Sequence, residues 1–396
     1  MTARKVVPQT LSQTIVNYVQ PWVEMIPGSS YFIKEEKKVV EKESVHDAIL
    51  RLAGLDVEEA ENSLVTLLRK CSMDLPEIEK DRLNLYFKIN TFQHKIDSCT
   101  FLTQFDQLRL LSSGEKKSVS QSWIALAVLD SQPVALKISF TPLEANGYVD
   151  NSLEVERKIY RRIINPLLLC GQTPHVLVYY SELDCKGFVE SLGMQTDDNS
   201  FNLLREMKKS YQNGAHFNFD EMHASVVERA VGKTIHKTFQ HFQDPDNRLA
   251  MNEPYTFGEI FLPVLFQVFY TLVVFTEIGL VHNDLHSGNV FVEVYRTPTT
   301  SRYLVGGKVY EIKSKFQSRF FDFDRGAKLA TEYNSIVISN DKLTKGNYCK
   351  EFGQCPELNE RSDLYTIVYM IHQYASSNTL LKQFLQKIVP KELLLR

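Results

Sequence analysis

Apolar and polar residues alternate along the chain from about residue 105, which is the pattern of half-buried β-strands. The clearest case is QSWIALAVLDSQPVALKISF (121–140), where an Asp-Ser-Gln-Pro interruption predicts a hairpin with a four-residue loop. The further elements expected here are a helix over 151–168 that ends near Pro166, a strand over 173–183, a polar insertion loop over 184–221, and a strand over 223–235 broken at Gly232.

The second half of the chain changes to helical spacing. An apolar run predicts a long helix over 256–279, a second helix is expected over 361–376, and a hairpin over 303–316 lies between them. The first helix is long enough to raise the question of a membrane span. It contains a proline, a glutamine and a glutamate and runs directly into a polar loop, so we interpret it as a buried helix of a large domain. Strands followed by helices predict an α+β, two-lobed plan.

The first hundred residues carry helical patterns without recognisable chemistry. The spacing over 45–70, broken near Gly54, predicts two short amphipathic helices. They form either a module that binds a partner protein or an extension that packs on the main domain. The predicted domains are a helical extension over 1–104 and a main domain over 105–396, with lobes over about 105–232 and 233–396.

Composition narrows the class of protein. The 396 residues carry a net charge of -3, so no overall positive field points to nucleic acid. The six cysteines are scattered without metal-ligand spacing, and the N-terminal residues hold no apolar core of signal-peptide length. We therefore expect a soluble intracellular chain with reduced thiols and no membrane partner, in the cytoplasm, the nucleus or a virus particle.

One candidate for chemistry is a lysine inside an apolar strand. In PVALKISF (133–140), alternation places Lys137 on the face opposite the larger apolar side chains, where burial is costly unless an anion meets it. On the following helix, Glu156 falls on the inward apolar stripe, whereas Glu154 falls on the solvated side. Glu156 is therefore the expected partner of Lys137. An edge position with its ammonium in solvent is the plain alternative for the lysine.

The polar loop HNDLHSGN (282–289) is the second candidate. Asp284 could accept a proton from an attacking hydroxyl, and the amide oxygen of Asn289 could ligate magnesium. A zinc site of His282, Asp284 and His286 is an alternative, but alternate positions on a loop do not converge as a helical i, i+4 pair does.

Downstream, an aspartate emerges at the end of an apolar strand. In SRFFDFDRGAK (318–328), Asp322 is well placed to ligate a hard cation, and an ordinary strand-end turn is its plain alternative. Further on, GQCPELNERSD (353–363) places Pro-Glu shortly before a helix whose first turn holds Asp363. Locally, that segment indicates no more than a good helix N-terminus.

Taken in order, these features resemble a protein kinase over about residues 105–376. The matching segments are VALK (134–137) for the lysine strand, HNDLHSGN (282–289) for the catalytic loop, DFD (322–324) for Asp-Phe-Gly, CPEL (355–358) for Ala-Pro-Glu, and VVERAVGKTI (226–235) for the hinge that holds adenine. The resemblance implies a bilobal protein-kinase-like fold with a strand-rich N-lobe and a helical, shortened C-lobe. It also implies ATP and Mg²⁺ as cofactors, with Mn²⁺ as an alternative metal.

The resemblance also assigns roles to residues. Lys137, held by Glu156, would contact the α- and β-phosphates; Asp284 would accept the proton of the substrate hydroxyl; Asn289 and Asp322 would hold the metal. The other implied nucleotide contacts are Gly114, Ala135, the backbone of Glu228 and Ala230, and His286. The implied substrate is serine or threonine of a protein.

Several departures narrow the family. Asn283 replaces the arginine that normally pairs with a phosphorylated activation loop, and His286 replaces a phosphate-contacting lysine. LLSSGEKKSVSQSW (110–123) offers Gly114 but no complete Gly-rich loop, and the interval between Asn289 and Asp322 contains an extra hairpin. These departures resemble haspin-like atypical kinases and the serine/threonine kinases of large DNA viruses.

Two other functions stay open. Small-molecule kinases of the choline or aminoglycoside type are also similar to the polar loop, but they lack the long segment between Asp322 and Pro356 on which protein substrates dock. A non-catalytic pseudokinase would account for the poor Gly-rich loop, whereas the retained lysine, glutamate, asparagine and aspartates argue against it.

Overall fold

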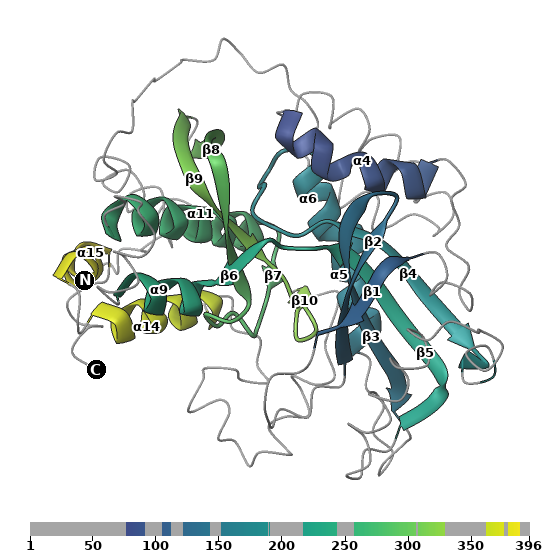
Figure 1. The fold of residues 1–396 in the computed structure, drawn as a ribbon. Helices are drawn as coiled ribbons and strands as arrows, with labels where there is room; N and C mark the ends of the chain where they lie inside the picture. Colours follow the sequence, from purple (N-terminus) through teal and green to yellow (C-terminus); the bar gives the residue numbers. More distant parts are fainter. Residues whose placement is uncertain are drawn as a thin grey trace, which may run out of the picture. The chain divides into compact units, whose positions relative to one another are not determined.

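The computed structural model describes residues 77–91, 105–111, 122–142, 152–188, 190, 217–243, 257–305, 308–328, 362–375 and 379–388. They fall into two compact units, each considered by itself (Figure 1). The sheet unit comprises the described parts of Ile49–Gly171 and Leu177–Arg229. The helical unit comprises Gln172–Val176 and the described parts of Ala230–Arg396. The helices expected over 45–70 lie outside the described residues.

The sheet unit is built on a five-stranded antiparallel sheet with strand order β1-β2-β3-β5-β4. Its elements are α4 (Glu77–Thr91), β1 (Asp106–Leu110), β2 (Ser122–Leu129), β3 (Gln132–Pro142), α5 (Ser152–Ile159), η2 (Tyr160–Ile164), α6 (Asn165–Leu169), β4 (Tyr179–Lys186) and β5 (Phe217–Glu228). Alternation in β3 holds as predicted, because Val134, Leu136 and Ile138 are fully buried while the residues between them are half-buried.

The β2–β3 hairpin has a tighter turn than predicted. Asp130 and Ser131 both have positive φ, 50° and 66°, and they alone connect the strands. Gln132 and Pro133 of the expected loop instead pair with Leu129 and Val128. A two-residue turn with positive φ at both positions matches the right-handed twist of its strands, which the longer loop would not.

The helix after β3 was predicted over 151–168 with its end near Pro166, and it ends at Leu169. Its middle turn is a π-helix, η2, after which Pro166 stands in the first turn of α6. Proline is tolerated at that position because its missing N–H is not needed there. Leu167, Leu168 and Leu169 are all buried, and their burial favours continuation of the helix.

The strands predicted over 173–183 and 223–235 each divide between the two units. The first divides because Val176 makes a bridge to Phe320 in the helical unit, whereas β4 begins only at Tyr179. The second becomes β5 and then β6 (Gly232–Thr234), with the unit boundary at Arg229–Ala230. Parts of the expected insertion over 184–221 belong to β4 and β5.

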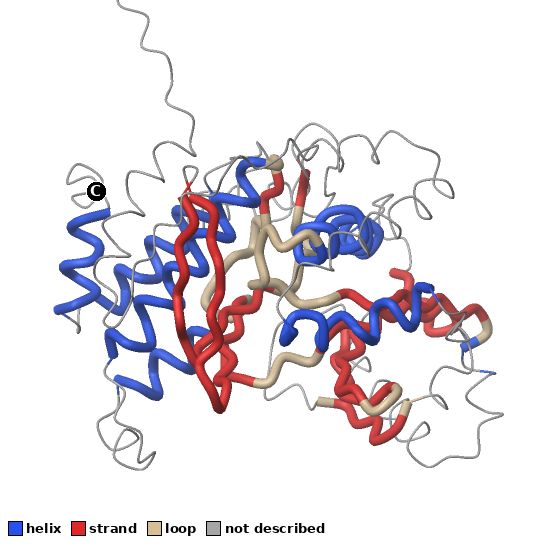
Figure 2. The backbone as a smooth tube through the Cα atoms, turned by 90° about the horizontal axis from the view of Figure 1, so that it is seen from above, coloured by secondary structure: helices blue, strands red, loops and turns tan. Residues whose placement is uncertain are grey.

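The helical unit combines four helices with two small sheets among its described residues. Its elements are β6, α9 (Ile235–Gln243), α11 (Phe257–Glu277), β7 (Leu280–Val281), β8 (Val290–Val305), β9 (Lys308–Phe320), β10 (Ala327–Lys328), α14 (Ser362–Ala375) and α15 (Thr379–Ile388). The strand orders are β6-β8-β9 and β10-β7. The predicted hairpin is much longer than expected and forms the long pair of strands in Figure 2.

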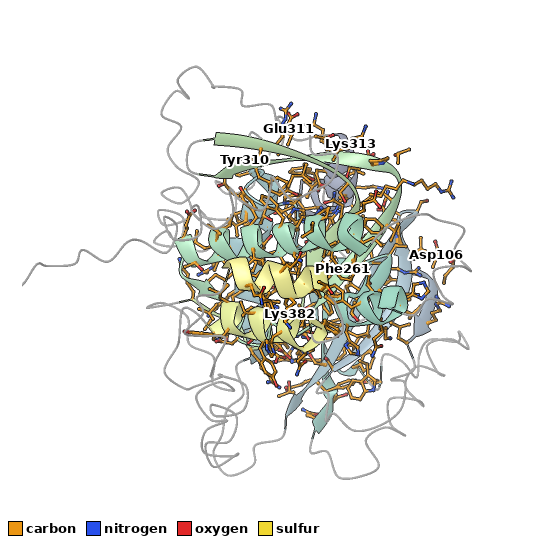
Figure 3. All side chains as sticks on the ribbon, turned by 90° about the vertical axis from the view of Figure 1, so that its left-hand side faces the viewer. Asp106, Phe261, Tyr310, Glu311, Lys313 and Lys382 are labelled. Atoms are coloured by element: carbon orange, nitrogen blue, oxygen red, sulfur yellow. The ribbon has the colours of Figure 1, made fainter. Side chains whose placement is uncertain are left out.

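Helix α11 packs against β9 and is the core of this unit. It is long and apolar enough to cross a membrane by length and composition, yet 83% of its most apolar window is buried inside the protein. Its polar residue Gln267 donates to the carbonyl of Phe316 at 2.9 Å and accepts from the amide of Ser318 at 2.7 Å. Figure 3 shows Phe261 of α11 among the helices and Tyr310, Glu311 and Lys313 along the ribbon of β9.

The predicted α+β class with a strand-rich part followed by a helix-rich part is confirmed. Helix α4, from the segment assigned to the extension, packs on β4 through buried Leu83, Leu85 and Tyr86. The element order of the sheet unit, with the lysine strand followed by the glutamate helix, is that of a protein-kinase-like fold.

Candidate functional site

The sheet unit contains the predicted lysine–glutamate pair. Lys137 on β3 donates to both carboxylate oxygens of Glu156 on α5, at 3.0 and 2.9 Å. Glu156 is only 2% exposed, so its charge requires a cation in place. The side chain of Lys137 is 15% exposed. This geometry holds a half-buried cation on a rigid strand, where it can meet an anionic group.

Two other predicted residues of the sheet unit lie near the same strands. Ala135 is half-buried and lies on the same face of β3 as Lys137. Glu228 is the last residue of β5, and its backbone amide donates to the carbonyl of Val178 at 2.8 Å. Ala230 follows in the connection to β6, within the helical unit. Gly114 and the Pro-Glu at 356–357 lie outside the described residues.

In the helical unit, the polar loop is held from beneath by a buried aspartate. The backbone amides of His282 and Asn283 donate to the two carboxylate oxygens of Asp363, at 2.7 and 2.9 Å. Asn283 has a φ of 60°, a conformation that costs energy in most residues. Burial raises the pKa of Asp363, while the nearby His282 and the two amide hydrogen bonds lower it. The first turn of α14 therefore holds the shape of the loop.

Asp284 lies in this loop with three polar neighbours. The side-chain amide of Asn289 donates to the Asp284 carbonyl at 2.8 Å and approaches its Oδ2 at 3.5 Å. Nη1 of Arg325 lies 3.4 Å from Oδ1. His286 Nε2 is 4.0 Å from Oδ2. The Asp284 carboxylate therefore lies within 3.5 Å of both the Asn289 amide and the Arg325 guanidinium.

His286 turns back on its own loop. Its Nδ1 accepts a hydrogen bond from the amide of Gly288 at 2.9 Å, so in the neutral ring the proton is on Nε2, toward Asp284. A Cβ on Gly288 would lie 2.6 Å from this ring, which explains the glycine. The side chain is 55% exposed. An exposed imidazole with one nitrogen bound to the loop can donate to an incoming anion.

The zinc alternative is not supported. Among the residues that the structure describes, no group of three or more His, Cys, Asp or Glu side chains could hold a metal ion. His282 is fully buried, and its Nε2 is 2.9 Å from the carbonyl of Phe321. This histidine therefore links the polar loop to the end of β9 instead of ligating a metal.

The oxygen-bearing residues predicted to hold magnesium are joined through the backbone. The amide of Phe321 donates to the carbonyl of Asn289 at 3.3 Å, and the two phenylalanine rings of Phe291 and Phe321 stack at 4.4 Å. Asp322 follows at once, with a φ of 68°. An amide oxygen and a carboxylate are the hard ligands that Mg²⁺ prefers, so the donor set fits this metal.

The sequence analysis missed two residues of this site. Asp363 was interpreted only as part of a helix start, since nothing local shows the loop that it binds. Arg325 was not singled out. The side-chain amide of Asn283 donates to the Arg325 carbonyl at 3.1 Å, so Asn283 joins the polar loop to the segment that follows β9.

Comparisons with known proteins give little similarity. No family model matches the chain, and no curated protein matches it. Among solved structures, the crystal structure of a kinase domain matches with 12% identity and a TM-score of 0.33, over 70% of this chain and 65% of that one. The description of the site therefore depends on the geometry of this chain.

Proposed function

We propose that this chain is an ATP- and Mg²⁺-dependent kinase that transfers the γ-phosphoryl group to serine or threonine of protein substrates. The observation that carries the proposal is the geometry of the polar loop. The side-chain amide of Asn289 donates to the Asp284 carbonyl, and the buried Asp363 carboxylate accepts from the backbone amide of His282. The bonded pair of Lys137 and Glu156 in the sheet unit agrees with it. Together they supply the ionic groups that phosphoryl transfer requires.

In this proposal each residue has one task. Lys137 neutralises the α- and β-phosphates and is held for that purpose by Glu156. Asp284 accepts the proton of the attacking hydroxyl as the γ-phosphoryl group moves to its oxygen, and ADP leaves. His286 donates from Nε2 to the γ-phosphate. Asn289 and Asp322 would hold Mg²⁺, which supplies neutralisation of phosphate charge when bound. Catalysis then comes mainly from positioning and charge neutralisation.

The adenine would be bound by backbone groups of Glu228 and Ala230, with Ala135 and Gly114 as further contacts. The support is the place of Glu228 at the end of β5, directly before the connection between the two units. We further propose an intracellular protein of an atypical, haspin-like or viral branch, because Asn283 and His286 replace the family's usual arginine and lysine.

A small-molecule kinase is the second candidate. The observation in its favour is the same polar loop, which both classes of kinase use. A pseudokinase is disfavoured, because the lysine–glutamate pair and the polar loop are both fully formed.

The test is transfer of labelled γ-phosphate from Mg-ATP to a basic protein, an acidic protein and a panel of small alcohols and aminoglycosides. Asp284→Asn should abolish transfer and leave ATP affinity within about twofold, because it removes the proton acceptor but no phosphate contact. Asp106→Asn, the same change at an exposed site on β1, is the matched control.

Label on protein serine or threonine that disappears in Asp284→Asn supports the proposal. Label confined to a small alcohol would instead assign the chain to the small-molecule class. Full activity in Asp284→Asn would contradict the role of the polar loop.

A further inference from the structure

An arginine of helix α4 forms an ion pair with Glu228, the last residue of β5. Nε of Arg82 donates to Oε1 of Glu228 at 2.7 Å, and Nη2 donates to Oε2 at 2.6 Å. Both planar groups are thus paired in parallel, the geometry in which arginine binds a carboxylate most strongly. Their side chains are only 8% and 12% exposed. This pair spans 146 positions of the sequence but lies entirely within the sheet unit.

Glu228 is held on its other side by Val178, the residue before β4. Its Oε2 also accepts from the backbone amide of Val178 at 3.1 Å, and its own amide donates to the Val178 carbonyl at 2.8 Å. The carboxylate and the backbone of Glu228 are therefore held together by two groups, Val178 and Arg82. Arg82 supplies the charge that makes burial of this carboxylate tolerable.

Helix α4 has its own anchors, which keep Arg82 in place. The hydroxyl of Tyr180 donates to the Arg82 carbonyl at 3.3 Å, and the side-chain amide of Asn90 donates to the Tyr180 carbonyl at 3.1 Å. Lys88 pairs with Asp130 of the β2–β3 turn at 2.9 Å. Helix α4, labelled in Figure 1, packs on β4 of the same unit. Its ties to β4, β5 and the β2–β3 turn make α4 part of the sheet unit.

We infer that Arg82 is a positioning residue for nucleotide binding, acting through Glu228 on the backbone that meets the adenine. The inference rests on the proposed function for the adenine contact, and on the ion pair for the mechanism. Loss of Arg82 leaves a nearly buried carboxylate without its cation. Glu228 must then turn toward solvent or take up a proton, and either change releases the backbone at the end of β5.

The effect should be specific to the base of the nucleotide. Lys137 lies in the middle of β3 and is held by Glu156, whereas Arg82 holds Glu228 at the end of β5, so binding of a triphosphate group alone should not depend on Arg82. This difference separates a positioning role from general stabilisation of the unit.

The experiment measures the affinity of the full-length chain for Mg-ATP and for Mg-tripolyphosphate by calorimetry, together with KM and kcat. We expect Arg82→Ala to weaken Mg-ATP binding about tenfold and to raise KM. The value of kcat should change little, because the adenine contact stabilises the bound substrate and the transition state equally. Mg-tripolyphosphate affinity should stay within about twofold. Lys88→Ala is the matched control, because it removes an ion pair between α4 and the β2–β3 turn without touching Glu228.

Two further variants guard against misfolding. Arg82→Lys keeps the charge but cannot make two parallel bonds, so ATP affinity should fall about threefold. The double reversal, Arg82→Glu with Glu228→Arg, should recover part of the affinity lost in Arg82→Ala. Equal losses in Arg82→Ala and Lys88→Ala, or equal losses for ATP and tripolyphosphate, would overturn the inference.

The same measurements distinguish this inference from the proposed function. A wild-type chain that binds Mg-ATP but transfers no phosphate would refute the kinase proposal, whereas the affinity comparison for Arg82 would still decide the inference. A wild-type chain that transfers phosphate from Mg-ATP, together with an Arg82→Ala variant that keeps full affinity for Mg-ATP, would overturn the inference alone.

Discussion

Asp363→Ala should loosen the polar loop more than any other single change near it. The substitution removes the acceptor of two backbone hydrogen bonds, from His282 at 2.7 Å and from Asn283 at 2.9 Å. Both amides lie in buried residues, and Asn283 has a positive φ that these bonds help to maintain.

The magnitude follows from the contacts. A hydrogen bond to a charged acceptor contributes about 1.5–3 kcal/mol, so two contribute about 3–6 kcal/mol. The gain is offset by the cost of burying the carboxylate, the same cost that raises the pKa of Asp363. A net loss of about 3 kcal/mol in the free energy of local opening corresponds to roughly a hundredfold faster amide exchange.

Hydrogen–deuterium exchange resolved at the loop amides is the assay, because it reports this loop separately from the sheet unit. Asp363→Asn keeps one carbonyl oxygen as an acceptor. The amides of His282 and Asn283 should therefore lose about half of their protection against exchange. Ser362→Ala is the control: Ser362 is the buried neighbour, and its hydroxyl makes only a 3.5 Å contact to the loop, with Asn283 Oδ1. Exchange at His282 and Asn283 as slow in Asp363→Ala as in Ser362→Ala would refute the reasoning.

Two other predictions concern stability. Gly232→Ala should lower the free energy of unfolding by about 2 kcal/mol, since its Cβ would lie 2.2 Å from the Val292 carbonyl oxygen; an unchanged urea midpoint would count against this. The hydrogen bonds that Asp184 makes with His223 and Arg157 lower the pKa of its carboxyl group to about 2, below the usual 3.8. The ionised Asp184 carboxylate therefore stabilises the fold above about pH 4, and this contribution is lost as the pH falls toward 2. The difference in free energy of unfolding between wild type and Asp184→Asn, measured in urea, should therefore shrink from about pH 5 to about pH 3. A pH-independent difference would disprove that assignment.

Local periodicity was enough to predict the lysine–glutamate pair. Alternation placed Lys137 on one face of β3, and helical spacing placed Glu156 on the inward face of α5. Few residues lie between the two elements, so the chain leaves little freedom in how they meet. The apolar character of α11 likewise predicted its burial, because a helix that is apolar on all sides must be covered.

Rules based on single residues failed where packing opposed them. Pro166 was expected to end a helix, but the π-turn before it and the buried leucines after it carry the helix onward. The Asp-Ser-Gln-Pro segment was expected to form a loop, but two of its residues are paired in strands. Burial of the leucines favours the helix past Pro166, whereas a two-residue turn that matches the twist of the strands favours the tighter hairpin.

The sequence by itself determined the class of fold, the order of the main strands and helices, and the residue types that could perform phosphoryl transfer. Only the tertiary structure decided that Asp363 supports the polar loop and that Arg82 supports Glu228. The partners in these contacts are far apart in the chain, 146 positions for Arg82 and Glu228. Periodicity tells which side of an element is buried, but the identity of a distant partner follows from the path of the chain and the need to pair every buried charge.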